Sequence, residues 1–212
     1  MDPRICPLNW DTYVETFPER YLRRGHFDDV MGQRLDKMRQ VLRVLEIGGG
    51  TTGCPLFQPE PPSNLRVWFL DPLVTKVPDW VVENLGWDQA VKGSLKFDLV
   101  VARGCINYLT PWEIRAIPDM LVPGGLFLAN TFGQVREGSR MSAGRKGLLQ
   151  ESIRWEHPNI VHHELTLPDG CVINHSFFHY TQNQYLVFLG GPEGGCLFTS
   201  YGDNSLLIEL RG

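Results

Sequence analysis

The stretch VLEIGGGTTGCP, residues 44–55, contains an apolar run, one acidic residue and four glycines within twelve positions. The run VLEI is too short for an ordinary helix and is typical of a strand that is buried on both faces of a sheet. The glycines after it predict a tight turn at the carboxyl end of that strand, where a ligand can approach a backbone without Cβ atoms. Glu46 lies inside the strand, and a carboxylate there must find hydrogen-bond donors. A purely structural turn is the alternative.

Further apolar runs of strand length follow the first, and segments with helical spacing separate them. The strand-like runs cover residues 43–48, 65–71, 97–104 and 124–132. The helix-like segments cover residues 28–42, 72–87 and 110–121, and the last of them opens with Thr110 as an N-cap before a proline. Strands that alternate with helices predict a parallel sheet with crossover connections, which is an α/β fold.

The sequence changes character after about residue 152. Residues 162–180 alternate between polar and apolar side chains around the turn PDG, and residues 195–210 surround the turn GDN. Each pattern predicts an antiparallel hairpin. The sequence has no internal repeat and no obvious linker, and 212 residues suit one sizeable core. We therefore expect a single domain.

The composition argues against several classes of partner. The formal net charge is -4 and no run of Lys and Arg is longer than RR at 23–24, so we expect no nucleic-acid partner. The five cysteines are scattered, without a Cys-x-x-Cys pair or zinc-type histidine spacing, which predicts reduced thiols and no metal site. The N-terminal residues lack the apolar region of a signal peptide, and no apolar run reaches membrane-spanning length. A cytoplasmic protein without a membrane partner is the expectation.

Four motifs follow one another along the chain: VLEIGGG at 44–50, FLD at 69–71, FDLVVARG at 97–104 and LVPGGLFLANT at 121–131. From about residue 40 to residue 132, the chain resembles the class I S-adenosylmethionine-dependent methyltransferases of the small-molecule type. The resemblance implies a Rossmann-like, seven-stranded, mostly parallel sheet with an antiparallel last strand pair and helices on both faces. It also implies a helical N-terminal cap (1–42), a cofactor-binding core (43–132), a β-hairpin lid (150–190) and final strands (191–212).

The resemblance also implies that S-adenosylmethionine is the cofactor, and it assigns contacts to individual residues. Glu46, the acid of the glycine motif, helps to hold the methionine end, and Gly48 and Gly50 lie beneath the cofactor. Asp71, at the tip of the second strand, binds the ribose hydroxyls, as a carboxylate in that position can. The other implied contacts are Thr51 in the glycine loop, Asp88 and its neighbour Gln89 near the adenine amine, and Arg103 beside the sulfonium.

Two features depart from the family pattern. The family reads Gly-x-Gly-x-Gly, whereas Gly53 comes one residue late here, after two threonines. The segment after the loop contains four prolines, and Pro59, Pro61 and Pro62 do not fit inside a continuing helix. We expect one or two helical turns at most, starting at Pro55.

The acceptor side of the site is less specified by the sequence. Methyl transfer is an in-line displacement that depends on positioning and sometimes on a base that deprotonates the acceptor. Tyr108, His175 and His179 are the candidates for catalysis, with His179 as a base in the hairpin. The alternative is a surface or lid role for both histidines and a core position for Tyr108. Further candidates for the acceptor pocket are Asn107, Tyr180, Tyr13 and Tyr21.

Together these features predict a methyltransferase that uses S-adenosylmethionine to methylate oxygen or nitrogen of a small molecule. One alternative is a catalytically inactive protein of the same fold that binds S-adenosylmethionine or a nucleoside. A second is a methyltransferase that acts on protein or RNA. A dinucleotide-dependent oxidoreductase is disfavoured because GGGTTG lacks the Gly-x-Gly-x-x-Gly spacing.

Overall fold

The computed structural model describes residues 25–38, 40, 42–131, 137–144, 147–156, 158–190, 195–201 and 205–212. Its elements in chain order, with η for a 3-10 helix, are α3 (His26–Leu35), β1 (Leu42–Ile47), η1 (Pro55–Phe57), β2 (Leu65–Leu70), β3 (Val81–Asn84), α4 (Trp87–Lys92), β4 (Phe97–Arg103), η2 (Ile106–Tyr108), α5 (Pro111–Ala116), η3 (Pro118–Met120), β5 (Leu121–Thr131), β6 (Gly138–Gly144), β7 (Gly147–Glu156), β8 (Ile160–Thr166), β9 (Val172–Phe178), α6 (Gln182–Phe188), β10 (Leu197–Tyr201) and β11 (Ser205–Arg211).

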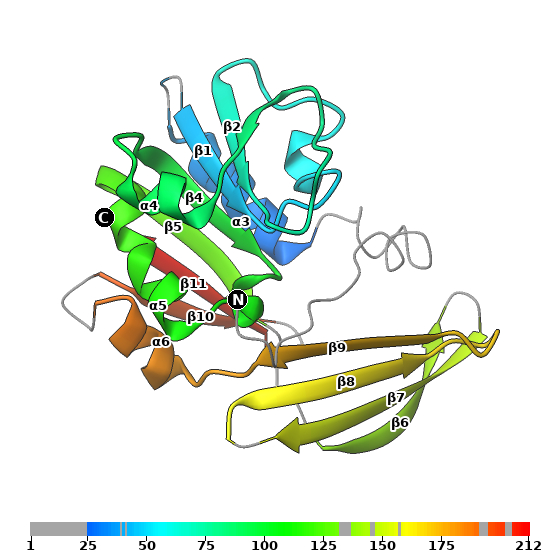
Figure 1. The fold of residues 1–212 in the computed structure, drawn as a ribbon. Coiled ribbons are helices and arrows are strands. Elements are labelled where there is room, and N and C mark those ends of the chain that lie inside the picture. The colour runs from blue at the N-terminus through cyan, green and yellow to red at the C-terminus, as the bar shows by residue number, and fades with distance from the viewer. Residues whose placement is uncertain are drawn as a thin grey trace.

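The main sheet has seven strands in the order β10-β11-β5-β4-β1-β2-β3 (Figure 1). The neighbours from β5 to β3 are parallel, whereas β11 runs antiparallel to both β5 and β10. The strand order reverses direction between β1 and β4, and ligands of open α/β sheets bind at the carboxyl ends of the strands at such a point. The predicted sheet, with its antiparallel last pair, is confirmed.

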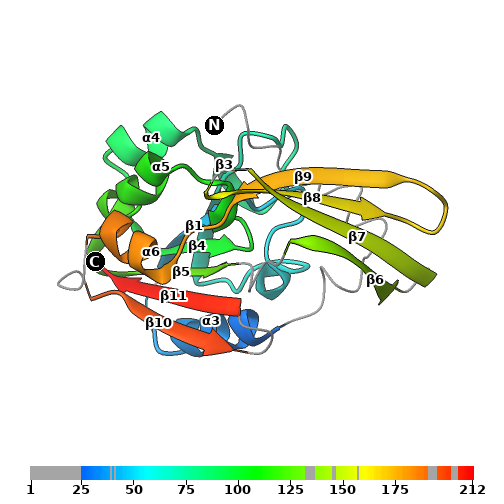
Figure 2. The same cartoon turned by 90° about the horizontal axis from the view of Figure 1, so that it is seen from below.

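Side chains of alternate strand residues enter two separate hydrophobic cores, one on each face of the sheet. One core contains Val44, Val67, Leu99, Val101 and Leu128 of the sheet, together with Phe27 and Met31 of α3 and Phe57 of η1. The other contains Leu45, Ile47, Val100, Ala102 and Phe127, together with Ala90 of α4, Ile114 of α5 and Tyr185 of α6. Figure 2 shows α3 on one side of the sheet and α4, α5 and α6 on the other. The predicted helices on both faces are confirmed.

Two of the helices expected from the spacing of apolar residues differ in the structure. The first ends at Leu35 rather than Leu42, because Leu42 already pairs with Leu65 as the start of β1. The expected helix over residues 72–87 is wrong. Pro78 interrupts that segment, and the valines after it form the edge strand β3 beside β2. Backbone pairing with β2 thus decides the structure there.

Two local predictions near helix starts are confirmed. The segment after the glycine loop forms a single turn, η1, that begins at Pro55. Thr110 caps α5, and its hydroxyl accepts from the N–H of Glu113. The Glu113 carboxylate in turn accepts from the N–H of Thr110 at 2.7 Å, which completes a capping box.

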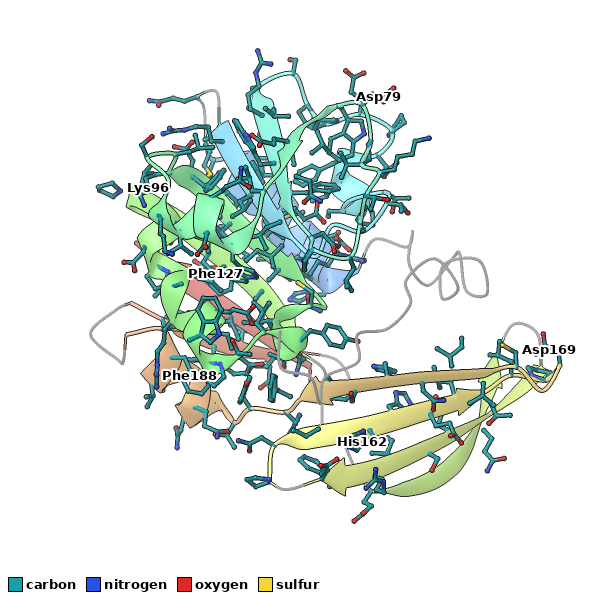
Figure 3. All side chains as sticks on the ribbon, viewed as in Figure 1. Asp79, Lys96, Phe127, His162, Asp169 and Phe188 are labelled. Carbon is teal, nitrogen blue, oxygen red and sulfur yellow. The ribbon has the colours of Figure 1, made fainter. Side chains whose placement is uncertain are left out.

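The hairpin predicted over residues 162–180 is confirmed as β8 and β9, and the one over 195–210 as β10 and β11. The first belongs to a second, antiparallel sheet of four strands in the order β6-β7-β8-β9. This sheet projects from the body, with Asp169 at its far tip (Figure 3). It starts at Gly138, and α6 follows it back in the body.

Tyr13, Tyr21 and the rest of residues 1–24 of the expected N-terminal cap lie outside the described residues. No helix in the described part of the chain is long and apolar enough to cross a membrane.

Candidate cofactor site

The glycine loop follows β1 at the carboxyl edge of the sheet, where the chain leaves no room for side chains. Gly48 has a φ of 70°, and a Cβ atom there would lie 2.7 Å from Cβ of Cys105. Gly53 has a φ of 72°, and its Cβ would lie 2.8 Å from the Trp80 ring. Gly49 meets the ring of Phe69 in the same way. The late position of Gly53 therefore fits the aromatic residues that pack beneath the loop.

Asp71 directly follows β2 and joins two loops of the site. Its carboxylate accepts from the N–H of Gly50 at 2.9 Å and from the N–H of Leu73 at 3.0 Å. Its backbone exchanges hydrogen bonds with the Asn84 side chain at the end of β3. A carboxylate has about four acceptor positions, so Asp71 retains acceptor capacity for a ligand hydroxyl. The residue expected to bind a ribose is thus held against the glycine loop.

Glu46 and Arg103 lie on the same side of the sheet as α3, because they continue the alternation of β1 and β4. The Glu46 carboxylate is 2% exposed and accepts from the N–H of Cys54 at 3.1 Å. Arg103 donates to both carboxylate oxygens of Asp28 in α3, at 2.9 and 3.0 Å. The thiol of Cys54 also lies 3.3 Å from Asp28. Glu46 and Arg103 therefore belong to one cluster of ionisable side chains that also includes Asp28.

Burial raises the pKa of Glu46 to about 7 from its ordinary value of 4.5. The N–H of Cys54 and the positive charge of Arg103 lower the pKa, whereas Asp28 and Asp71 add to the rise. The folded protein therefore binds this proton more tightly than the unfolded chain does. The resulting stability is fully present below about pH 4.5 and is lost as the pH rises through about 7.

Replacing Glu46 by glutamine should remove this part of the pH dependence. Glutamine keeps an acceptor for the N–H of Cys54 but has no proton to lose. The variant should gain about 2–3 kcal/mol in free energy of unfolding, relative to the wild type, between pH 5 and pH 8. Urea unfolding across this range measures the difference. Parallel pH profiles of the two proteins would contradict the raised pKa.

A cavity of about 60 Å³ lies at the carboxyl edge of the sheet. Its walls are Ile47, Gly48, Leu70, Asp71, Pro72, Leu73, Trp87, Cys105, Tyr108, Leu109 and Glu113. The polar groups of Asp71 and Glu113 thus share the cavity with apolar and aromatic walls. Pockets for ligands of drug size occupy about 300–1,000 Å³, so a nucleoside requires this cavity to widen. Leu73, which is 58% exposed, lies in the loop after β2 and forms part of the wall.

Of the residues expected to bind the cofactor, Gly48 and Asp71 line this cavity, whereas Glu46, Gly50, Thr51, Asp88, Gln89 and Arg103 do not. The side chain of Asp88 is 83% exposed and pairs with Lys92 at 2.9 Å on the surface of α4. Gln89 accepts from the N–H of Gly86 at 2.7 Å and so caps the same helix. Thr51 is exposed in the glycine loop. Trp87, the first residue of α4, lines the cavity instead and offers an aromatic face near the position expected for adenine.

Two of the three candidates for the acceptor side meet in the structure. Tyr108 lines the cavity, and its hydroxyl lies 3.1 Å from Nδ1 of His175 in β9. The His175 ring stacks on Phe177 and is 6% exposed. Burial, together with a smaller effect of the nearby His163, lowers the pKa of His175 to about 3. His175 is therefore a neutral hydrogen-bonding partner of Tyr108 at physiological pH.

His179 occupies a different environment. It follows the last residue of β9 and packs edge-on against Trp155, with a distance of 5.3 Å between ring centroids. Burial lowers its pKa, and its Nδ1 has no hydrogen-bond partner in the described part of the chain. Asn107 donates to the carbonyl of Phe178, and Tyr180 donates to the carbonyl of Leu109. These two residues connect the second sheet to the edge of the main sheet.

The sequence reasoning missed Asp28, Cys105 and Glu113. Asp28 is one of two acidic residues in the first turn of α3. The sequence does not indicate which of the two forms an ion pair with Arg103, 75 residues further along the chain. Cys105 lies two residues after Arg103, where only the three-dimensional path of the loop places it against Gly48. The role of Glu113 could have been predicted from the sequence, since an acid three residues after the N-cap Thr110 is the pattern of a capping box.

Comparisons with known proteins find relatives by structure only. No protein-family model matches the sequence, and the search of curated proteins finds no match. The chain is similar to the CcbJ methyltransferase from Streptomyces caelestis, with a TM-score of 0.61 and 13% identity over 95% of this chain and 98% of that one. The PH0226 protein from Pyrococcus horikoshii OT3 gives a TM-score of 0.62 and 15% identity, over 94% and 98% of the two chains.

A third similar structure is the glycopeptide N-methyltransferase MtfA in complex with S-adenosylmethionine. Its TM-score is 0.51 at 16% identity, over 88% of this chain and 94% of that one. Other structures of MtfA contain sinefungin or S-adenosylhomocysteine. The chain therefore has the fold of the class I S-adenosylmethionine-dependent methyltransferases, as its motifs predict.

Proposed function

We propose that this protein is an S-adenosylmethionine-dependent methyltransferase that acts on oxygen or nitrogen of a small-molecule acceptor. The observation that carries the proposal is the junction between Asp71 and Gly50 at the carboxyl edge of the sheet. There a carboxylate with spare acceptor positions accepts from the N–H of Gly50, whose φ is 62°. In this fold, that edge is the cofactor side.

Asp71 and Trp87, which line the cavity, fit the cofactor in chemistry. Asp71 would accept from the ribose hydroxyls, and Trp87 would cover the adenine. Glu46 lies on the α3 side of the glycine loop and would face the ammonium of the methionine end, where a positive charge favours its ionised form. S-adenosylmethionine, when bound, supplies a methyl group activated by the sulfonium. The chain supplies binding and orientation.

Tyr108 and His175 are the residues that we assign to the acceptor. Tyr108 belongs to the cavity wall, and His175 belongs to the second sheet, so their 3.1 Å contact joins the cofactor side to that sheet. Positioning is the main requirement of an in-line methyl transfer, and a closed site also excludes water. The second sheet would act as the lid over the acceptor. His179 stays a weaker candidate, since its described contact is with Trp155.

Labelled cofactor tests the proposal even when the acceptor has not been identified. The purified protein is incubated with trideuteromethyl S-adenosylmethionine and a cell extract separated into small-molecule, protein and RNA fractions. We expect the label in a small molecule, identified by mass spectrometry, and at a level that falls when Tyr108 is replaced by phenylalanine. Label in the protein or RNA fraction would support a macromolecular acceptor.

The same experiment separates a catalytically inactive protein from an enzyme. Such a protein would bind S-adenosylhomocysteine and transfer no label to any fraction. The shortened segment after the glycine loop, reduced to the single turn η1, is the feature that favours this second candidate. The hydrogen bond between Asp71 and Gly50 supports binding of the cofactor. It does not distinguish an enzyme from an inactive protein that binds the same cofactor.

A further inference from the structure

His163 extends the contact between Tyr108 and His175 into a chain of three side chains. Nδ1 of His163 lies 2.9 Å from Nε2 of His175, whose other ring nitrogen lies 3.1 Å from the Tyr108 hydroxyl. The residues come from β8, β9 and η2, and His163 pairs directly with His175 in the sheet. Both nitrogens of His175 are therefore engaged, one toward the cavity and one away from it.

Only two arrangements of hydrogens fit this chain. The buried His175 is neutral, so one of its nitrogens donates and the other accepts. In the first arrangement, Tyr108 donates to Nδ1 of His175, and Nε2–H of His175 donates to His163. In the second, both hydrogen bonds run in the opposite direction, and the Tyr108 hydroxyl oxygen accepts from Nδ1–H of His175. The two arrangements differ in whether the hydroxyl of Tyr108, a residue that lines the cavity, donates its hydrogen to His175 or accepts one from it.

The chemistry of the three groups favours the first arrangement. A phenol is a better donor than a neutral imidazole N–H, and an imidazole nitrogen is a better acceptor than a phenolic oxygen. Glu151 lies on the same face of β7, two residues from Ile153, the residue that pairs with His163.

We propose that His163 is a positioning residue that holds His175 as the Nε2–H tautomer and thereby makes Tyr108 a hydrogen-bond acceptor toward the cavity. The phenolic oxygen then binds a methyl acceptor that presents an N–H or O–H group. This specificity rests on the proposed function, whereas the tautomer does not. The arrangement resembles the way in which a second group fixes the tautomer of a metal-binding or catalytic histidine.

Long-range ¹⁵N–¹H NMR spectra of the ¹⁵N-labelled protein at pH 7 test the tautomer directly. We expect His175 to show a protonated Nε2 and an unprotonated Nδ1 in the wild type. A protonated Nδ1, or a doubly protonated ring, would overturn the proposal. This measurement requires neither acceptor nor cofactor.

Variants of His163 test whether this residue determines the tautomer of His175. In His163→Phe, His175 loses its acceptor, and its spectrum should shift toward the Nδ1–H form. In His163→Gln, an amide oxygen replaces the acceptor, and the Nε2–H form should return. The wild-type tautomer in His163→Phe would overturn the proposal. If that variant does not fold, the wild-type spectrum still decides the tautomer, and loss of the Nε2–H form in His163→Gln would overturn the proposal.

His162 provides the matched control. It is the neighbour of His163 on β8, so its side chain points to the opposite face, where its Nε2 lies 2.6 Å from Glu156. His162→Phe should leave the His175 spectrum unchanged, and a shift there would overturn the specific role of His163. Wild type and His163→Phe should bind S-adenosylhomocysteine with the same affinity. Absence of binding by both proteins would contradict the proposed function and leave the tautomer result intact.

Discussion

Replacing Asp71 by alanine lowers the affinity for S-adenosylhomocysteine by at least tenfold. The substitution removes the acceptor for the ribose hydroxyls, and it also frees the N–H groups of Gly50 and Leu73 that the carboxylate holds. The loss of a charge-assisted hydrogen bond contributes about 1.5–3 kcal/mol, and each 1.4 kcal/mol is a factor of ten in affinity. Calorimetric titration of the variant and the wild type measures the difference.

Asp88→Ala is the control for this prediction. Both residues are acidic and lie near the carboxyl edge, but the Asp88 side chain faces solvent and pairs with Lys92. The affinity of Asp88→Ala should stay within about twofold of the wild type, since exposed ion pairs contribute little. An unchanged affinity in Asp71→Ala would refute the ribose assignment. A large loss in Asp88→Ala would restore the adenine contact implied by the sequence.

Replacing Arg103 by methionine lowers the free energy of unfolding by about 3 kcal/mol. The variant leaves Asp28, which is 1% exposed, without the guanidinium that neutralises it. Removing one partner of a buried pair costs about 3–5 kcal/mol, and the lower end applies because Arg103 itself is 20% exposed. Urea unfolding with a two-state analysis measures the change.

Two comparisons isolate the pair itself. The double variant Arg103→Met/Asp28→Asn should recover part of the stability lost in the single Arg103 variant, because no uncompensated charge remains. Lys92→Met, which breaks an exposed pair, should cost less than about 1 kcal/mol. Equal losses in Arg103→Met and Lys92→Met would show that burial does not govern the Arg103 pair.

The parallel strands could be predicted because a strand covered on both faces needs a continuous apolar run. The core strands β1 and β4 carry such runs, and their alternate residues enter the two cores. The edge strand β3 has no such run, since only Val81 of its four residues is buried. Its valines also fit helical spacing, so the pairing of β3 with β2 could not be predicted from the sequence.

The positions in the fold of the residues expected to bind the cofactor were predictable where a strand end places them. Glu46, Asp71 and Arg103 each lie at or near the carboxyl end of a parallel strand, and of the three only Asp71 lines the cavity. Asp88 and Gln89 lie in a helix, where a shift of one position turns a side chain from the cavity to solvent. In α4 the position that faces the cavity belongs to Trp87. The partner Asp28 could not be predicted, since the pair joins distant elements.

Calorimetric titration of the wild-type protein with S-adenosylhomocysteine tests the central claim most directly. The claim is that the carboxyl edge of the sheet, around Asp71 and the glycine loop, binds this class of nucleoside. We predict one site per chain with a dissociation constant in the micromolar range or tighter. No detectable binding in that range by a folded sample would contradict the claim.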